Sequence, residues 1–215
     1  MSNDLYETEN YLDGGWTEEP TSMVTQRTYI GDAIGSFYML KSVGVVESGP
    51  QKGLWLIEDP ETGEAVPFDS GMRNYDSRFR QYCGSALPKL TMGWSNTLRF
   101  YGVDVTMSFS GQFGYKIFNC QRMFYENLNI GLNRYKSATQ PVYGTTLAKS
   151  QQPVAVSYYL EDGDYIKLDN FTVGYTFNTK NVKYLDKARV YVSGENLLCS
   201  TKYQGLDPEL NYSGY

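Results

Sequence analysis

Two clusters of acidic residues are the part of the sequence best suited to chemistry, because carboxylate oxygens bind hard cations and act as general acids and bases. The first, EDPETGE, covers residues 58–64, and the second, EDGD, covers residues 161–164. Neither has the D-x-[DN]-x-[DN]-G spacing of a calcium loop. A carboxylate pair for glycoside hydrolysis needs a defined separation across a cleft, which neither cluster indicates. We therefore interpret both clusters as solvated turns.

Histidine is absent from the 215 residues. This excludes Ser-His-Asp and Cys-His nucleophile systems and zinc sites with histidine ligands. The three cysteines, at positions 83, 120 and 199, match neither a CxxC motif nor a disulfide framework, so we expect free thiols or small buried side chains. The net charge of −5, without a basic cluster, argues against nucleic acid as a partner. We predict that the chain is not an enzyme and has no cofactor and no metal site.

Exposed aromatic side chains could bind sugars by stacking on their rings. The candidates for sugar stacking, or for an interfacial aromatic girdle, are Trp16, Trp94, Tyr158 and Tyr159. Trp94 favours the girdle, since it lies on the apolar side of an alternating segment, near the start of that segment. Trp55 stands beside two leucines in a short hairpin, where local packing is the simpler interpretation.

The stretch from residue 90 to residue 114 is the element around which the rest is organised. Apolar and small polar residues alternate along it with period two, and a tight connection at 101–103 divides it into two arms. This pattern predicts a long antiparallel hairpin, whose arms have the ~9–11 residues that a tilted strand needs to cross a bilayer. A soluble strand with one wet face would show the same alternation. The lipid-facing candidates are Val105, Met107, Phe109 and Phe113, and the lumen-facing candidates are Asp104, Thr106, Ser108, Ser110 and Gln112.

The remaining sequence also favours strands. Aromatic residues make up 15%, glycines number 21, and the mean hydropathy is −0.46. We expect a short strand within 21–30, a small hairpin formed by 54–57 and 65–68, loops at 69–87 and 129–153, and an amphipathic helix over 117–128. In 161–178 the apolar set changes phase, which predicts a bulge or a change of environment near 169–170. Residues 188–198 predict a further strand, and no domain boundary is evident.

Several short motifs occur together in a fixed order over about four-fifths of the chain. They are AIGSFY at 33–38; LPK at 87–89 with GWSN at 93–96; VDV at 103–105 with FGYKIFN at 113–119; DGDYIKL at 162–168 with GYT at 174–176; and RVYVSGENL at 189–197 with KYQGLDPE at 202–209. In these motifs the sequence resembles the SusC/RagA branch of the TonB-dependent outer-membrane transporters of Bacteroidetes.

The resemblance implies an all-β fold in which antiparallel strands form an arc of a large transmembrane outer-membrane β-barrel, of the plugged 22-stranded class. We expect an arc of about six to eight strands, with long extracellular loops and one or two short helices. Residues 1–215 would be the C-terminal part of such a barrel, without the signal peptide, the plug and the closing strand.

The resemblance also implies partners and a location. The full-length transporter would lie in the bacterial outer membrane, contact the lipid bilayer, and work with the TonB system and a SusD-like surface lipoprotein. It would import oligosaccharides or peptides by gated passage, without bond chemistry in this segment.

Two alternatives remain open from the sequence. The chain could be a stand-alone soluble β-domain that binds carbohydrate, or a truncated or silent gene segment without activity of its own. Whether Val105, Met107, Phe109 and Phe113 face lipid or a closed protein core separates the membrane wall from the soluble domain.

Overall fold

The computed structural model describes residues 11–17, 22–74, 77–131, 133–180 and 184–209. The chain divides into two compact units whose segments interleave along the sequence. Unit 1 comprises 1–87, 116–161 and 204–215, and unit 2 comprises 88–115 and 162–203. The sequence pattern did not reveal this division, because the boundaries at 87/88 and 115/116 each fall in a short connection between consecutive strands.

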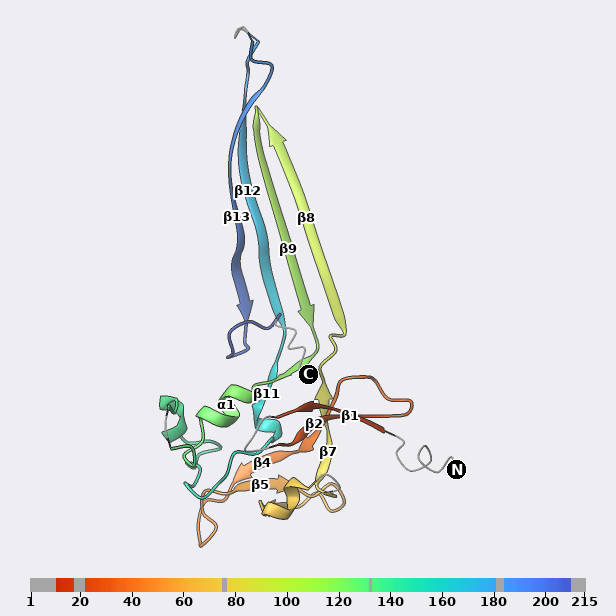
Figure 1. Cartoon of the computed structure of the whole chain (residues 1–215), viewed down its shortest axis with the longest axis vertical. Coiled ribbons are helices and arrows are strands. Elements are labelled where there is room, and N and C mark those ends of the chain that lie inside the picture. The colour runs from red at the N-terminus through yellow and green to blue at the C-terminus, as the bar shows by residue number, and fades with distance from the viewer. Residues whose placement is uncertain (1–10, 18–21, 75–76, 132, 181–183, 210–215) are drawn as a thin grey trace, which may run out of the picture. The chain divides into compact units, whose positions relative to one another are not determined.

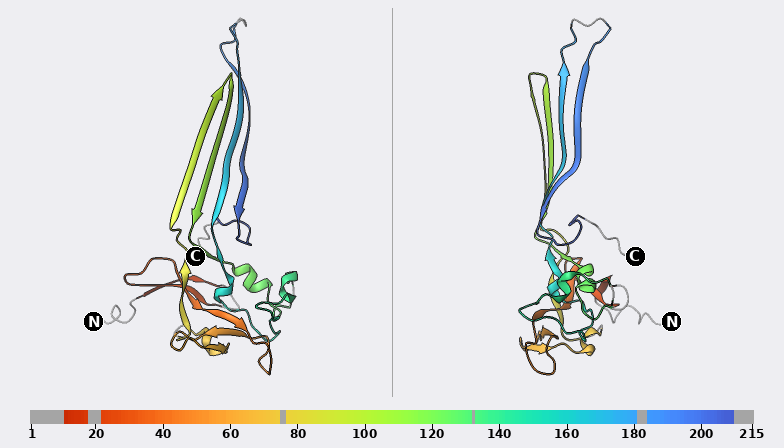
Figure 2. Two further views of the ribbon diagram at one scale, coloured as in Figure 1. Left: turned by 180° about the vertical axis from the view of Figure 1, so that it is seen from behind. Right: turned by 90° about the vertical axis from the view of Figure 1, so that its left-hand side faces the viewer.

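Unit 2 is one antiparallel sheet of four long strands, in the order β13-β12-β9-β8 (Figure 1). The strands are β8 (Leu90–Phe100), β9 (Val103–Phe113), β12 (Tyr165–Phe177) and β13 (Ala188–Thr201). Figure 2 shows them side by side from two further directions. The predicted central hairpin is therefore confirmed, although the sheet has fewer strands than the six to eight that we expected.

The turn between β8 and β9 consists of Tyr101 and Gly102, whose φ angles are 48° and 84°. Positive φ at both central residues is the requirement of a type I′ turn, whose twist matches that of the flanking strands. The tight turn fixes the register from Phe100↔Val103 to Leu90↔Phe113 without interruption.

A bulge in β12 explains the phase change that the sequence shows. Leu168 pairs with Phe109 and Asn170 pairs with Ser108, which are consecutive residues of β9. Asp169 is therefore an extra residue of β12 without a pairing partner on β9. The register with β13 shifts at the same place. The predicted bulge is confirmed, and it keeps Leu168 and Phe171 on the same, apolar face of the sheet on either side of Asp169.

Unit 1 contains short strands and little helix. One sheet has the order β1-β2-β3-β7, a second has the order β4-β5-β6, and β10 pairs with β11. The strands are β1 (Tyr11–Trp16), β2 (Val24–Tyr29), β3 (Ser36–Leu40), β4 (Ser42–Val45), β5 (Trp55–Glu58), β6 (Ala65–Pro67), β7 (Arg80–Ser85), β10 (Lys116–Phe118) and β11 (Leu160–Asp162). The helical segments are α1 (Cys120–Tyr125) and three 3₁₀ turns, η1 (Ser70–Arg73), η2 (Lys136–Thr139) and η3 (Ser157–Tyr159).

Unit 1 confirms some predictions and corrects others. The strand within 21–30 and the hairpin of β5 and β6 are confirmed. The loop predicted at 69–87 is wrong over β7, because this polar segment pairs with β3 and takes its order from that partner. The predicted helix is shorter than 117–128. Its first residues form β10, and the Asn119 side chain caps α1 by accepting a hydrogen bond from the Arg122 N–H at 3.1 Å.

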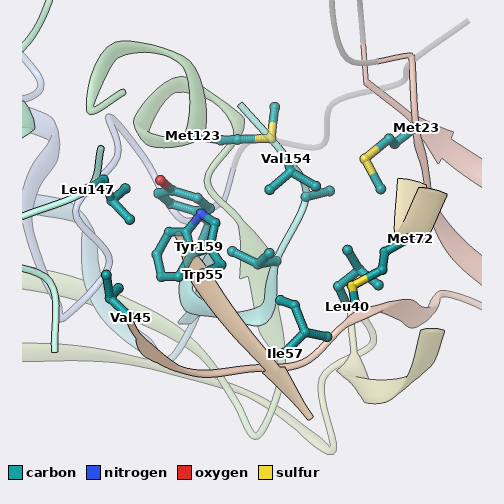
Figure 3. Close-up of a cluster of buried hydrophobic side chains, with 12 residues drawn as sticks. Met23, Leu40, Val45, Trp55, Ile57, Met72, Met123, Leu147, Val154 and Tyr159 are labelled. Atoms are coloured by element: carbon teal, nitrogen blue, oxygen red, sulfur yellow. The ribbon is translucent and has the colours of Figure 1, made fainter. Parts of the chain in front are cut away.

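The core of unit 1 gathers around Trp55, which has no exposed surface (Figure 3). Tyr159 lies against it with ring centroids 6.0 Å apart, and Leu40, Ile57 and Met123 are also fully buried. The local packing expected for Trp55 is confirmed. None of the helices in the described ranges is long and apolar enough to span a membrane.

Candidate functional site

The sheet of unit 2 has one polar and one apolar face. Directly paired residues of antiparallel strands project to the same face, and most cross-strand rows are predominantly polar or predominantly apolar. One row on the polar face joins Thr97, Thr106, Thr172 and Ser193. The adjacent row on the apolar face joins Leu98, Val105, Val173 and Val192. The alternation predicted for β9 thus extends across all four strands.

Hydroxyl groups on the polar face bond to one another across the strands. The Thr97 and Thr106 hydroxyl oxygens are 3.0 Å apart, and those of Ser95 and Ser108 are 2.9 Å apart. At the bulge, the Ser110 hydroxyl donates to the Asp169 carboxylate at 3.0 Å. These pairs form a hydrophilic surface suited to contact with water or with a polar partner.

Many apolar side chains of β8, β12 and β13 on this face are exposed, while those of β9 are half-buried. Val192 is 76% exposed, Leu198 is 69% exposed, and Leu98 is 53% exposed. Aromatic side chains also occur on this face. Trp94 packs on Phe109 near the middle of β8 and β9, with centroids 5.7 Å apart, and at the end of β12 the centroids of Tyr175 and Phe177 are 4.9 Å apart. A contiguous apolar surface of this extent marks an interaction with a protein or a membrane.

The structure places all nine lipid-facing and lumen-facing candidates on β9, on the two faces that the sequence predicted. They separate cleanly because β9 has no bulge against β8 between Val103 and Phe113. The medium that each face contacts remains a prediction.

The sequence analysis missed a charged cluster on the polar face beside the β8–β9 turn. The Arg189 guanidinium on β13 reaches across β12 to Asp104 on β9, and Nε donates to Oδ1 at 3.0 Å. A Cβ atom on Gly174 would lie 2.6 Å from Nη2 of Arg189 and 2.8 Å from both carboxylate oxygens of Asp104. Only glycine at position 174 therefore allows this ion pair to pass over the intervening strand.

Arg99 and Lys187 complete the charged cluster and act electrostatically on Asp104. The surface around them forms a shallow depression of about 680 Å³, which also reaches Thr106 and Thr176. The sequence held one sign of this cluster, because Asp104 is the only charged residue among the five lumen-facing candidates on β9. Its partner, 85 positions away, was not identifiable without the strand register.

The first acidic cluster is an ordered turn. Burial alone would raise the pKa of Asp59, whose side chain is 5% exposed. The Glu61 N–H, 3.0 Å from Oδ1, and the Arg78 guanidinium outweigh burial and hold the pKa of Asp59 below its ordinary value. Among the described residues, no group of His, Cys, Asp and Glu is arranged to hold a metal ion.

The second acidic cluster contributes Glu161 to a buried ion pair. Arg122 Nη1 donates to the Glu161 carboxylate at 2.7 Å, and Arg122 also pairs with Glu126, the residue that follows α1. Burial alone would lower the pKa of Arg122, but the bonds to Glu126 and Glu161 raise it. The other Glu161 oxygen accepts from the Gln204 N–H at 2.6 Å. Glu161 thus ties α1 to the segment that follows β13.

The four aromatic candidates have different surroundings. Trp94 is 52% exposed on the apolar face of unit 2, and Trp16 is 58% exposed at the end of β1. Tyr158 is half-buried beside Trp55, with centroids 5.4 Å apart. Tyr159 is 1% exposed, and burial raises the pKa of its hydroxyl. The structure corrects the interpretation of Tyr159, because a ring buried in the core offers no face to a sugar.

Comparisons with known proteins agree with the sequence motifs. The chain is 32% identical over 87% of its length to TonB-dependent receptor P3 of Formosa agariphila, and 25% identical over 85% to TonB-dependent receptor P26 of that organism. It spans 20% of the length of each of these relatives. No family model matches the chain.

Solved structures of the RagAB peptide importer have a similar fold. The TM-score is 0.66 for the closed-closed state and 0.68 for the open-open state, with 23% sequence identity in both cases. These matches cover 94% and 95% of this chain and 22% of the importer chain. The resemblance to SusC/RagA TonB-dependent transporters is confirmed.

Proposed function

We propose that this chain forms four adjoining strands in the wall of an outer-membrane importer. Its sequence and fold resemble one segment of a SusC/RagA-type TonB-dependent receptor. The observation that carries the proposal is the two-faced sheet of unit 2. A wall between lipid and a wet lumen needs an apolar and a polar face on the same strands. The apolar face contacts lipid through Val105, Met107, Phe109 and Phe113. The polar face lines the lumen from Asp104 to Gln112.

The strand lengths support this assignment. Eleven residues, as in β8 and β9, extend about 36 Å at ~3.3 Å per residue. A tilt of ~45° reduces this to about 25 Å along the membrane normal, the height of the apolar band of an outer-membrane barrel. The aromatic pair Tyr175–Phe177, at the end of β12, belongs to an interfacial girdle, whereas Trp94 and Phe109 lie next to the middle of their strands.

The connections give the orientation of the wall. Outer-membrane barrels have short periplasmic turns and long extracellular loops. Tyr101 and Gly102 alone join β8 to β9, whereas residues 114–164 lie between β9 and β12. The turn at 101–102 therefore faces the periplasm. Residues 114–164 belong to the long extracellular connections in this proposal.

The full-length protein takes up oligosaccharides or peptides in this proposal. TonB supplies the energy for gated passage, and a SusD-like lipoprotein on the cell surface is the partner. The curated relatives are named TonB-dependent receptors and the solved neighbour is named a peptide importer, which supports uptake as the activity. This segment contributes a wall and an outer surface and catalyses no reaction.

Site-directed spin labelling of the full-length transporter in membranes tests the assignment of the faces. Single cysteines at 104–109, in a background without other cysteines, carry the label. We expect labels at 105, 107 and 109 to be relaxed by oxygen, which concentrates in lipid, and labels at 104, 106 and 108 by a water-soluble nickel chelate. Equal accessibility at all six positions would contradict a membrane wall and favour a soluble β-domain. The reverse phase would show that the two faces are assigned the wrong way round.

A further inference from the structure

We infer that Glu161 is a coupling residue, whose carboxylate holds two connections of unit 1 together so that they move as one body. The first connection is the segment 116–161, which lies between β9 and β12, and the second is the segment that follows β13 from Gln204 onward. The inference rests on the proposed function, because it takes both connections to lie on the cell surface.

Glu161 and Gln204 mark the points at which the chain leaves unit 1 and returns to it. The residues between them, 162–203, belong to unit 2 and include β12 and β13. Because Tyr165 pairs with Thr201, the chain leaves β13 at the end where it entered β12. The Gln204 N–H then donates to Glu161 Oε2 at 2.6 Å, across 43 sequence positions. This hydrogen bond therefore joins the two connections where the long excursion of the chain through β12 and β13 begins and ends.

The other carboxylate oxygen of Glu161 binds the first connection. Oε1 accepts hydrogen bonds from Arg122 Nη1 at 2.7 Å and from Asn119 Nδ2 at 3.1 Å. The Asn119 side chain also caps α1, so the carboxylate is connected to this helix at its start and through Arg122. Hydrogen bonds to an ionised group are roughly twice as strong as those between neutral groups. Each connection is thus bound to a different oxygen of one charged group.

The burial of Glu161 makes separation of the two connections unfavourable. Its side chain is 9% exposed, so a connection that moved away would leave a carboxylate oxygen without its donor where little water reaches it. The second connection has little packing of its own, since Pro208 is the one buried residue among the described positions 204–209. Its order therefore depends on the bond to Glu161 more than on burial.

Distances between spin labels in the full-length transporter, folded into lipid vesicles, test the inference. Labels replace Gln121 and Leu206, which are exposed positions on the first and the second connection. We expect one narrow distance distribution when Glu161 is present. Glu161→Gln should lose it, because an amide offers one acceptor oxygen where the carboxylate offers two.

Glu126→Gln is the matched control. Glu126 belongs to the first connection and pairs with Arg122 at 2.9 Å. Its substitution removes one carboxylate from Arg122 and leaves the bonds of Glu161 to Asn119 and Gln204 in place. The narrow distribution should therefore persist. A narrow distribution in Glu161→Gln, or broadening of equal extent in both variants, overturns the inference.

A second variant covers the case in which Glu161→Gln loosens unit 1 as a whole, which faster amide exchange in β5 would reveal. Gln204→Pro removes the N–H that binds Glu161 Oε2 and leaves the contacts of Asn119 and Arg122 intact. The distance distribution should broaden in Gln204→Pro while exchange in β5 stays unchanged. A narrow distribution in this variant also overturns the inference.

Labelling of whole cells separates failure of the inference from failure of the proposed function. Single cysteines at 121 and 206, in a background without other cysteines, should react with a membrane-impermeant maleimide. If both react and the distance distribution is the same with and without Glu161→Gln, the coupling is wrong and the orientation of the wall stands. If either reacts only after the outer membrane is permeabilised, the proposed orientation and the coupling on the cell surface are both refuted.

Discussion

Arginine substitutions along β9 should lower the free energy of unfolding more on the apolar face than on the polar face. On the apolar face, the loss should decrease with distance from the bilayer midplane. Met107 lies next to the middle of β9 and projects from the apolar face, where it pairs with Phe171. In the proposed wall, Met107→Arg places a charge near the bilayer midplane, which costs about 2–4 kcal/mol in an outer-membrane barrel. Ser108→Arg, one residue further, places the same side chain in the lumen and should cost about 0–1 kcal/mol.

The depth dependence follows from the strand geometry. Val105 is three residues from the centre of β9, about 10 Å along the strand at ~3.3 Å per residue. With a tilt of ~45° this is about 7 Å from the midplane, roughly half-way to the edge of a ~25 Å apolar band. We therefore expect Val105→Arg to cost about 1–2 kcal/mol, less than Met107→Arg. Thr106→Arg, on the lumenal face, should again be nearly neutral.

Guanidinium titration of the full-length transporter folded into lipid vesicles measures these differences as shifts in the unfolding midpoint at constant slope. The order of cost should be Met107, then Val105, then Ser108 and Thr106. Equal costs at adjacent positions would refute the two-faced wall. A larger cost at Ser108 than at Met107 would show that the faces are assigned the wrong way round.

Three further results are expected from unit 1. Glu161→Gln leaves Arg122 with Glu126 as its remaining carboxylate partner and should destabilise unit 1 by about 1–3 kcal/mol, measured as faster amide hydrogen exchange in β11. Because the folded-state pKa of Asp59 is depressed, the stability it contributes is present above its ordinary pKa of 3.8 and is lost as the pH falls through the lowered value. Asp59→Asn should remove this acid-dependent loss in a pH titration of hairpin exchange. Burial raises the pKa of the Cys83 thiol to about 11, so maleimide labelling at pH 8 should be slow in the folded protein and fast after denaturation.

Controls exist for each of these results. Glu64→Gln removes an exposed carboxylate and should leave hydrogen exchange in unit 1 unchanged. Equal destabilisation at Glu64 and Glu161 would contradict the role of the buried ion pair. If acid sensitivity persists in Asp59→Asn, another carboxylate is responsible. Rapid labelling of folded Cys83 would show that its environment opens readily.

The sequence predicted most of unit 2 because its signals are local. The alternation along β9 and the turn at Tyr101 and Gly102 need only neighbouring residues to be recognised. The phase change between Leu168 and Phe171 was recognisable for the same reason, and it corresponds to the bulge at Asp169. Every side chain of β9 therefore lies on the face that its position in the sequence predicted.

Unit 1 was less predictable because its order depends on contacts between distant segments. The β7 strand has a polar sequence and acquires its conformation by pairing with β3, some 40 positions earlier. Tyr158 and Tyr159 are adjacent, yet one is half-buried and the other is core, because η3 directs Tyr159 against Trp55. The ion pair between Asp104 and Arg189 likewise required the register of three strands.

The two units bury their apolar residues in opposite ways, and this contrast bears on the soluble alternative. Unit 1 encloses a cluster of large apolar side chains, among them Trp55 and Ile57. In unit 2 the Ser and Thr side chains bond to one another on one face, and Leu98 and Val192 on the other face are more than half exposed. A carbohydrate-binding domain would cover such a face with a second sheet or a helix, since exposed contiguous apolar surface favours association or aggregation. A lipid bilayer removes that requirement, because the apolar face is then the solvated one.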